Sequence, residues 1–136
     1  MAKKVERIII DTNLWISFLI KKDFRQLDAR IQKGNTKLIF SVDSMDEFLS
    51  VTDRPKFKKY FRKEDLEQLI EFFDVYGEII AVRSTVYICR DPKDNFLLSL
   101  CKASKAKYLI TGDSDLLVLK QFDETKILTM AQYLKM

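Results

Sequence analysis

The stretch Ile8-Ile9-Ile10-Asp11-Thr12-Asn13 shows in a few residues how this chain is built. Three successive isoleucines favour a buried β-strand, because β-branched side chains pack well on a pleated surface. Thr12 and Asn13 can then cap a helix that opens with Leu14. Asp11 is therefore expected at the carboxyl end of a strand, where open α/β sheets bind their ligands. The alternative for Asp11 alone is a helix cap without a chemical role.

The composition is that of a folded globular protein. Of 136 residues, 47% are hydrophobic and only three are glycine and two proline, so we expect a single domain over residues 1–136. The net charge of +4 permits binding to a polyanion without demonstrating it. The chain has no histidine, which excludes Ser-His-Asp triads and zinc sites that need imidazole.

The cysteines and the lengths of the apolar runs indicate the cellular compartment in which the protein is expected. Cys89 and Cys101 are too few for a disulfide framework, and their apolar neighbours predict buried free thiols. The N-terminal residues lack the apolar segment of a signal peptide. No run approaches the roughly 20 apolar residues that span a bilayer. We therefore expect a cytoplasmic protein with no membrane segment.

Short apolar runs alternate with helical patterns along the whole chain. Strands are predicted at about 5–10, 38–40, 79–82, 108–110 and 126–128, with an extended stretch at 86–88. Helices are predicted at about 14–19, 24–33, 42–52, 64–76, 93–104, 114–119 and 130–134, with a break near 21–23. This alternation calls for a mostly parallel sheet with helices on both faces.

The predicted helix at 42–52 carries an acid close to its buried side. Its core face is expected to consist of Val42, Met45, Phe48, Leu49 and Thr52. Glu47 lies beside that face rather than opposite it. The side chain of Glu47 can therefore reach the rim of the sheet's carboxyl edge while its neighbours pack.

Six acids lie at predicted strand ends or helix starts: Asp11, Glu47, Asp91, Asp94, Asp113 and Asp115. Parallel strands end at the same edge of a sheet, so the carboxylates that follow them can converge. Any one acid could instead cap a helix N-terminus. Clustered carboxylates repel one another, and a divalent cation relieves that repulsion. Oxygen-only ligands select hard ions, so Mg²⁺ or Mn²⁺ is expected, together with phosphodiester hydrolysis.

A basic stretch with interleaved aromatic residues follows the Glu47 helix. Its cations include Arg54, Lys56, Lys58 and Lys59, and Phe57 and Tyr60 lie among them. These cations are candidates for holding a phosphodiester backbone, and the aromatic rings for stacking on a base. The alternative is a solvated helix face with a buried aromatic side.

Four motifs, in order over nearly the whole chain, resemble those of PIN-domain nucleases. They are Ile8-Ile-Ile-Asp11-Thr-Asn13, Ser44-Met-Asp-Glu47-Phe-Leu-Ser-Val with Arg54-Pro55-Lys56-Phe57, Asp91-Pro-Lys-Asp94-Asn-Phe-Leu-Leu-Ser-Leu, and Leu109-Ile-Thr111-Gly-Asp113-Ser-Asp115-Leu-Leu. The second motif is similar to that of the VapC-like toxin components of type II toxin–antitoxin systems. The helix after Asp94 departs from many relatives, which have small residues where this chain has Leu98, Ser99 and Cys101.

The resemblance implies a three-layer α/β/α sandwich and a Mg²⁺- or Mn²⁺-dependent endoribonuclease that leaves a 5′-phosphate and a 3′-hydroxyl. Carried over by position, the acidic quartet is Asp11, Glu47, Asp94 and Asp113. Supporting residues are the acids Asp91 and Asp115 and the polar residues Asn13 and Thr111. The implied partners are an RNA substrate, an antitoxin protein and a second copy in a homodimer.

Two other functional classes stay open from the sequence. A phosphatase or phosphotransferase would use Asp11 as a nucleophile, but such enzymes usually carry a second Asp where this chain has Asn13. A non-catalytic RNA-binding protein of the same fold would bind RNA without cutting it. The intact quartet argues against the second class.

Overall fold

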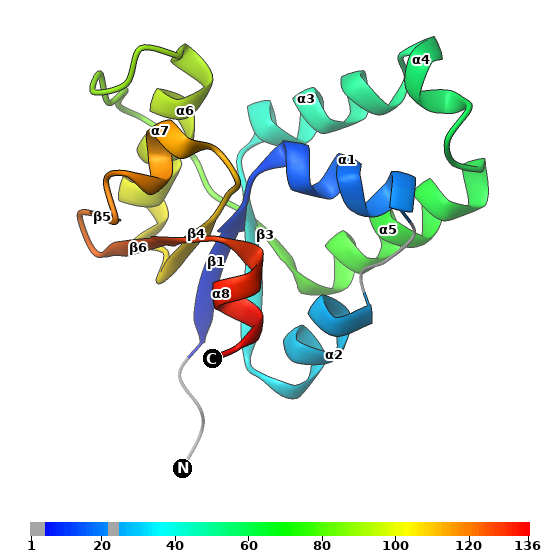
Figure 1. The fold of residues 1–136 in the computed structure, drawn as a ribbon, viewed down its shortest axis with the longest axis horizontal. Helices are drawn as coiled ribbons and strands as arrows, with labels where there is room; N and C mark the ends of the chain where they lie inside the picture. Colours follow the sequence, from blue (N-terminus) through cyan, green and yellow to red (C-terminus); the bar gives the residue numbers. More distant parts are fainter. Residues whose placement is uncertain (1–4, 22–24) are drawn as a thin grey trace.

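A six-stranded sheet forms the middle layer of the molecule (Figure 1). The computed structural model describes residues 5–21 and 25–136. The strands are β1 (Glu6–Ile10), β2 (Thr36–Phe40), β3 (Gly77–Ile79), β4 (Tyr108–Ile110), β5 (Gln121–Phe122) and β6 (Thr125–Leu128). Their order across the sheet is β3-β2-β1-β4-β6-β5, and only the β5–β6 pair is antiparallel.

The order of the strands reverses at β1. The chain first builds outward from β1 through β2 to β3, and then returns to add β4 on the other side of β1. Ile8 pairs in register with Leu38 of β2 and with Tyr108 of β4. Ligands of open α/β sheets bind where the order reverses, outside the carboxyl ends of the strands. In this fold that position is the crevice between the ends of β1 and β4.

Helices cover both faces of the sheet and produce the expected three-layer sandwich. They are α1 (Thr12–Lys21), α2 (Arg25–Lys33), α3 (Val42–Thr52), α4 (Pro55–Lys58), α5 (Lys63–Tyr76), α6 (Pro92–Ser104), α7 (Ser114–Leu117) and α8 (Met130–Leu134). Ile8 and Ile10 pack into the core on one face, and Ile9 packs into the core on the other. Successive side chains of a strand point to opposite faces, so the isoleucine run serves both cores.

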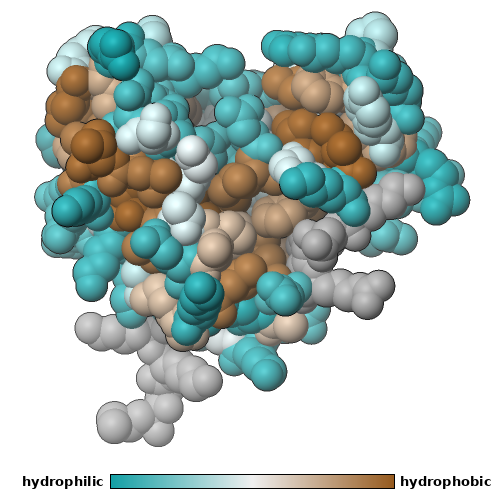
Figure 2. Space-filling model, viewed as in Figure 1, coloured by the Kyte–Doolittle hydropathy of each residue, from teal (hydrophilic) through white to brown (hydrophobic). Residues whose placement is uncertain are grey.

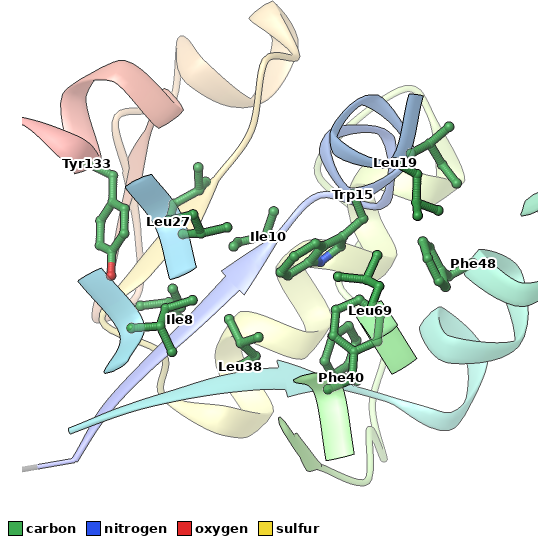
Figure 3. Close-up of a cluster of buried hydrophobic side chains, with 14 of the residues drawn as sticks. Ile8, Ile10, Trp15, Leu19, Leu27, Leu38, Phe40, Phe48, Leu69 and Tyr133 are labelled. Carbon is green, nitrogen blue, oxygen red and sulfur yellow. The ribbon is translucent and has the colours of Figure 1, made fainter. Parts of the chain in front are cut away.

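Aromatic rings fill the core between the sheet and the helices α1, α3 and α5. The ring of Phe73 lies 4.7 Å from Trp15, 4.8 Å from Phe40 and 5.4 Å from Phe48, measured between centroids. Figure 3 shows Trp15 reaching from α1 toward Phe40 of β2, with Phe48 entering from α3. Phe73 therefore joins two helices and a strand to α5. The core on the other face includes Leu97, Leu98 and Cys101 of α6.

Three features of the strands differ from the sequence predictions. β3 begins at Gly77 rather than at residue 79, because α5 passes directly into the strand. A Cβ atom at Gly77 would lie 2.3 Å from the carbonyl oxygen of Phe73, so only glycine permits this passage. β3 also ends at Ile79 rather than at residue 82, and the short hairpin strand β5 had no counterpart in the prediction. Residues 86–88, predicted as an extended stretch, belong to no strand.

The predicted core face of α3 is partly wrong. Val42 and Leu49 are 63% and 39% exposed, whereas Ser44, Phe48 and Thr52 are buried. Ser41 and Ser44 form a reciprocal capping box, in which each backbone N–H donates to the other residue's hydroxyl at 2.9 and 3.0 Å. This cap turns Ser44 inward, and the residues four and eight positions later follow it into the core.

Three further predictions were that the two cysteines are buried, that the helices break near residues 21–23, and that no segment spans a membrane. Cys101 is fully buried, and burial raises the pKa of its thiol to about 12, whereas Cys89 is only partly buried. Residues 22–24, where a break between helices was predicted, lie outside the described part of the chain. None of the helices within residues 5–21 and 25–136 is long and apolar enough to cross a bilayer.

Candidate functional site

Asp11 and Thr111 continue the sheet one residue beyond β1 and β4. The backbone N–H of Asp11 donates to the carbonyl of Ile110 at 2.9 Å, and that of Thr111 donates to the carbonyl of Leu128 at 2.9 Å. Both residues are buried. Figure 2 shows a notch in the molecular surface above the carboxyl end of β1, between the part formed by α6 and α7 and the part formed by α3 and α4.

The Thr111 hydroxyl links the two strand ends. It donates to Asp11 Oδ2 at 2.9 Å and accepts from the backbone N–H of Asp113 at 3.1 Å. The other carboxylate oxygen of Asp11, Oδ1, accepts from the backbone N–H of Asn13 at 3.1 Å. Asp11 itself therefore caps α1, rather than Thr12 or Asn13 as predicted. Its carboxylate is held by a donor on each side.

The Thr111→Val variant should be less stable while keeping its fold. Valine preserves the branched shape but leaves Asp11 Oδ2 and the Asp113 N–H without their partner, at a cost of about 1–3 kcal/mol in unfolding free energy. Thr111→Ser keeps the hydroxyl and should recover most of that free energy, as measured by urea denaturation. Equal unfolding free energies for the two variants would contradict this role of the hydroxyl.

Three carboxylates converge at the starts of α6 and α7. Oxygen atoms of Asp94, Asp113 and Asp115 all lie within 4.8 Å of one another. Asp113 caps α7 by accepting from the backbone N–H of Asp115 at 2.9 Å. Asp91 caps α6 in the same way, by accepting from the backbone N–H of Lys93 at 2.9 Å. The two caps fix where α6 and α7 begin, and the clustered acids lie at these two helix starts.

Asp94 is the most perturbed acid of this cluster. Its side chain is almost completely buried, and burial is the main cause that raises its pKa from 3.8 to about 6. A hydrogen bond with Asp113 and the negative charges of Asp113, Asp91 and Asp11 raise the pKa further. The donor set consists of carboxylate oxygens alone, and the charges of Asp113, Asp91 and Asp11 all act on Asp94. Both properties fit a hard divalent cation such as Mg²⁺ or Mn²⁺.

Two basic side chains pair with acids at the edge of the cluster. Lys93 Nζ lies 3.5 Å from Glu47 Oε1, which joins the start of α6 to α3. Arg90 Nη2 lies 3.3 Å from Asp115 Oδ2. Glu47 is not among the three clustered acids, and the structure gives its carboxylate a lysine partner instead. Within the described contacts, Asn13 takes part through its backbone N–H, while its side chain is exposed.

The predicted RNA-binding cations lie on and around α4. Figure 1 shows α4 beyond the end of α3 that is far from α6 and α7. α3 has 11 residues, so it separates the two regions by roughly 16 Å. Lys58 pairs with Asp53 at 3.1 Å, and Lys56 and Lys59 lie over the rings of their neighbours Phe57 and Tyr60. The structure therefore does not bring Arg54, Lys56, Lys58 and Lys59 to the acidic cluster.

Two buried polar residues of α6 were missed by the sequence reasoning. Asn95 Oδ1 accepts from the backbone N–H groups of Ile88 and Cys89 at 2.9 and 2.7 Å, and Asn95 Nδ2 donates to the Cys89 carbonyl at 2.9 Å. Ser99 Oγ accepts from the backbone N–H of Val86 at 2.8 Å. Both side chains are buried on α6 among Leu97, Leu98 and Leu100. The available signal was their i, i+4 spacing, which puts two polar groups on one face.

Comparisons with known proteins agree with this architecture. The protein is 31% identical to the uncharacterized protein MJ1680 of Methanocaldococcus jannaschii over 132 residues, which cover 94% of this chain and 83% of that protein. It is 30% identical to ribonuclease R of Mycoplasmopsis pulmonis over 107 residues. That match spans 74% of this chain but only 14% of the longer protein.

The fold is also similar to that of a solved structure. A chain in the crystal structure of VapBC2 from Rickettsia felis, bound to a DNA fragment from their promoter, matches with a TM-score of 0.57. The match covers 89% of this chain and 96% of that chain, at 16% sequence identity. A family model described as PIN domain matches residues 7–115, a range that contains every acid of the site from Asp11 to Asp115. The chain therefore belongs to the PIN domain family.

Proposed function

We propose that this protein is a divalent-metal-dependent endoribonuclease and the toxin of a toxin–antitoxin pair. The observation that carries the proposal is the convergence of Asp94, Asp113 and Asp115 within 4.8 Å at the edge of the sheet where the strand order reverses. Membership of the PIN domain family supports a nuclease. The similarity of the fold to a chain of a VapBC2 complex supports a toxin.

The residues that would hold the metal are the acids of the cluster and their neighbours. Asp94 and Asp113 would be the central ligands, together with Asp11 at the end of β1, and Glu47 of α3 would join them only by exchanging Lys93 for the metal. Asp91 and Asp115 support them through direct or water-mediated contacts. Bound Mg²⁺ or Mn²⁺ would activate a water molecule and stabilise the charge that develops on the phosphate.

The chain's own residues prepare this chemistry. The Thr111 hydroxyl and the backbone N–H of Asn13 hold the Asp11 carboxylate in place. Asp91 and Asp113 are held because each accepts a hydrogen bond from the backbone of the helix that it caps. In the reaction, the oxygen of water bonds to phosphorus and the P–O3′ bond breaks. The products are a 5′-phosphate and a 3′-hydroxyl. This hydrolysis uses no histidine, in agreement with the composition.

Cleavage of unstructured RNA tests the proposal directly. The purified protein should cut the RNA with Mg²⁺ or Mn²⁺ and should stop when EDTA is added. Restoring the metal in excess should restore cleavage. Cleavage that persists in EDTA would contradict the metal requirement, and no cleavage with either metal would contradict the nuclease proposal itself.

Metal binding should also raise the melting temperature. Millimolar Mn²⁺ is expected to shift the unfolding midpoint upward, because a ligand that binds only the folded state stabilises it by mass action. The bound cation also removes the repulsion between Asp94 and the neighbouring carboxylates. A thermal melt with Mn²⁺, compared with a melt with Na⁺ at matched ionic strength, measures the shift in melting temperature. An unchanged midpoint would show that the acids do not form a metal site.

The toxin role predicts a protein partner and harm to the host. Expression of the parent should arrest growth, and a variant without nuclease activity should not. Co-expression with the product of a small neighbouring gene should relieve the arrest and yield a stable complex. Growth that is indifferent to expression of the active enzyme would favour a housekeeping nuclease.

A phosphatase with an Asp11 nucleophile is less well supported. Such enzymes usually carry a second Asp two residues after the nucleophile, and this chain has Asn13 there, which meets Asp11 through its backbone N–H. Trapping of a phosphorylated Asp11 would restore this alternative.

A further inference from the structure

The segment Val86–Asp91, here called the 86–91 loop, is attached to α6 by buried side chains. Asn95 holds the backbone of Ile88 and Cys89 through three hydrogen bonds, and Ser99 holds that of Val86 through one. Asp91 then begins α6 as its cap. A loop held at residues on either side of Tyr87 has little freedom to move. Figure 1 shows the chain from β3 rising to the start of α6, beside α7.

This fixed loop presents apolar groups to solvent. The side chain of Tyr87 is 84% exposed and that of Ile88 is 56% exposed, although their neighbours Val86 and Cys89 pack against the core. An aromatic ring on a rigid backbone offers a stacking surface at a low entropic cost. Base–aromatic stacking is a general means of binding single-stranded nucleic acid.

The loop also reaches the acidic cluster. Arg90 Nη2 lies 3.4 and 3.3 Å from the two carboxylate oxygens of Asp115, one of the three clustered acids. Tyr87 is three residues from Arg90, which corresponds to at most about 10 Å of chain. A base stacked on Tyr87 would therefore belong to a nucleotide close to the phosphate at the carboxylates. Arg90 is almost fully exposed, and exposed ion pairs contribute little to stability, so it can exchange Asp115 for a phosphate at little cost.

We propose that the 86–91 loop is a nucleotide subsite for single-stranded RNA, in which Tyr87 stacks on an unpaired base and Arg90 contacts the adjacent phosphate. This inference rests on the proposed ribonuclease function and names the part of the chain that selects unpaired RNA. The basic residues around α4 are the competing surface. They lie at the other end of α3, roughly 16 Å from the acidic cluster.

Binding measurements without cleavage test the subsite independently of catalysis. The background is the full chain with Asp94→Asn, in EDTA, and the probe is a short unstructured RNA that carries a fluorophore. Fluorescence anisotropy should show a Kd roughly tenfold higher for Tyr87→Ala, the scale of one lost stacking contact. Tyr87→Phe retains the ring and should keep Kd within about twofold. Because Tyr87 is exposed, neither change should alter the melting temperature.

Two comparators sharpen the result. Tyr60→Ala removes another exposed ring, which lies beneath Lys59, and should change Kd by less than Tyr87→Ala does. A fully base-paired RNA has no unpaired base to stack, so its affinity should be the same for Tyr87→Ala and the parent. Arg90→Gln should weaken binding of the unstructured RNA and reduce its salt dependence, as expected for a lost phosphate contact.

The outcomes separate this inference from the proposed function. RNA binding that is insensitive to Tyr87→Ala but weakened by Tyr60→Ala would overturn the inference and place the RNA on α4. Binding that depends on Tyr87 would support the subsite even if the parent protein failed to cut RNA, a failure that would remove the nuclease proposal alone. Absence of RNA binding by every variant would overturn the subsite, whereas the nuclease proposal depends only on cleavage by the parent protein in Mg²⁺ or Mn²⁺.

Discussion

Asp94→Asn should abolish RNA cleavage and, at the same time, stabilise the metal-free protein at neutral pH. Cleavage is expected to fall by roughly a hundredfold or more, the scale of losing a group that stabilises charge in the transition state. The amide retains the shape of the side chain but cannot supply the negative charge that a divalent cation requires. Cleavage of unstructured RNA in Mn²⁺ measures the first effect, and urea denaturation in EDTA measures the second.

The pH dependence follows from the pKa of Asp94. Burial and the neighbouring acids raise this pKa from 3.8 to about 6 in the folded protein. Between these values the folded state binds more protons than the unfolded state, so the unfolding free energy falls as pH rises. A difference of about two pH units corresponds to up to about 3 kcal/mol, lost between about pH 4 and pH 6. Asp94→Asn should flatten this part of the profile.

Asp74→Asn is the matched control, because Asp74 is an exposed acid of α5. It removes the same charge far from the cluster and should leave both cleavage and the pH profile unchanged. Metal should reverse the sign of the Asp94 effect, so that the parent becomes the more stable protein in Mn²⁺. An Asp94→Asn variant that cleaves at the parental rate would remove Asp94 from the site.

Phe73→Ala should be among the most destabilising single substitutions in this chain. Phe73 is buried, and its ring contacts Trp15, Phe40 and Phe48 from three other elements. Truncation removes these contacts and leaves a cavity, which typically costs about 3–5 kcal/mol. That is a large share of the roughly 5–15 kcal/mol by which domains are stable. Urea denaturation followed by tryptophan fluorescence would report the loss directly, since Trp15 is the only tryptophan.

Val75→Ala is the comparison for this second prediction. Val75 lies on the same helix two residues later, but its side chain is largely exposed. Its truncation should change the unfolding free energy by less than about 0.5 kcal/mol. A Phe73→Ala protein that unfolds at the parental urea concentration would show that α5 contributes little to the core.

Much of the sheet could be predicted from local pattern. The isoleucines of β1 and the apolar runs of β2, β4 and β6 are recognisable because buried parallel strands are continuously apolar. The boundary of β3 could not be predicted, because it depends on how closely α5 approaches the strand at Gly77. The exposure of Val42 and Leu49 depends on the Ser41–Ser44 cap. The cap sets the rotation of α3 about its axis, so that Ser44, Phe48 and Thr52 face the core instead.

The site shows the same division. Asp11 and Asp113 follow strands whose direction the alternation of elements predicts, so their shared edge could be inferred from the order of apolar runs and acids along the chain. Glu47 is different, because its position depends on which side chains lie near it. In the structure its carboxylate pairs with Lys93 rather than with the clustered acids. The loop-holding roles of Asn95 and Ser99 depend on which turn of α6 faces the 86–91 loop.

The sequence by itself determined the class of fold and predicted the kind of site. Apolar periodicity specifies strands and helices, and acids without histidine predict a site made of oxygen ligands. Only the tertiary structure decided which acids meet and what surrounds them. Convergence depends on sheet order, helix rotation and the competition of nearby cations for each carboxylate, and these are set by contacts between residues distant in the chain. Asp11, the end of the first strand, is placed by local sequence, but its partner Thr111 comes from a strand 100 residues later.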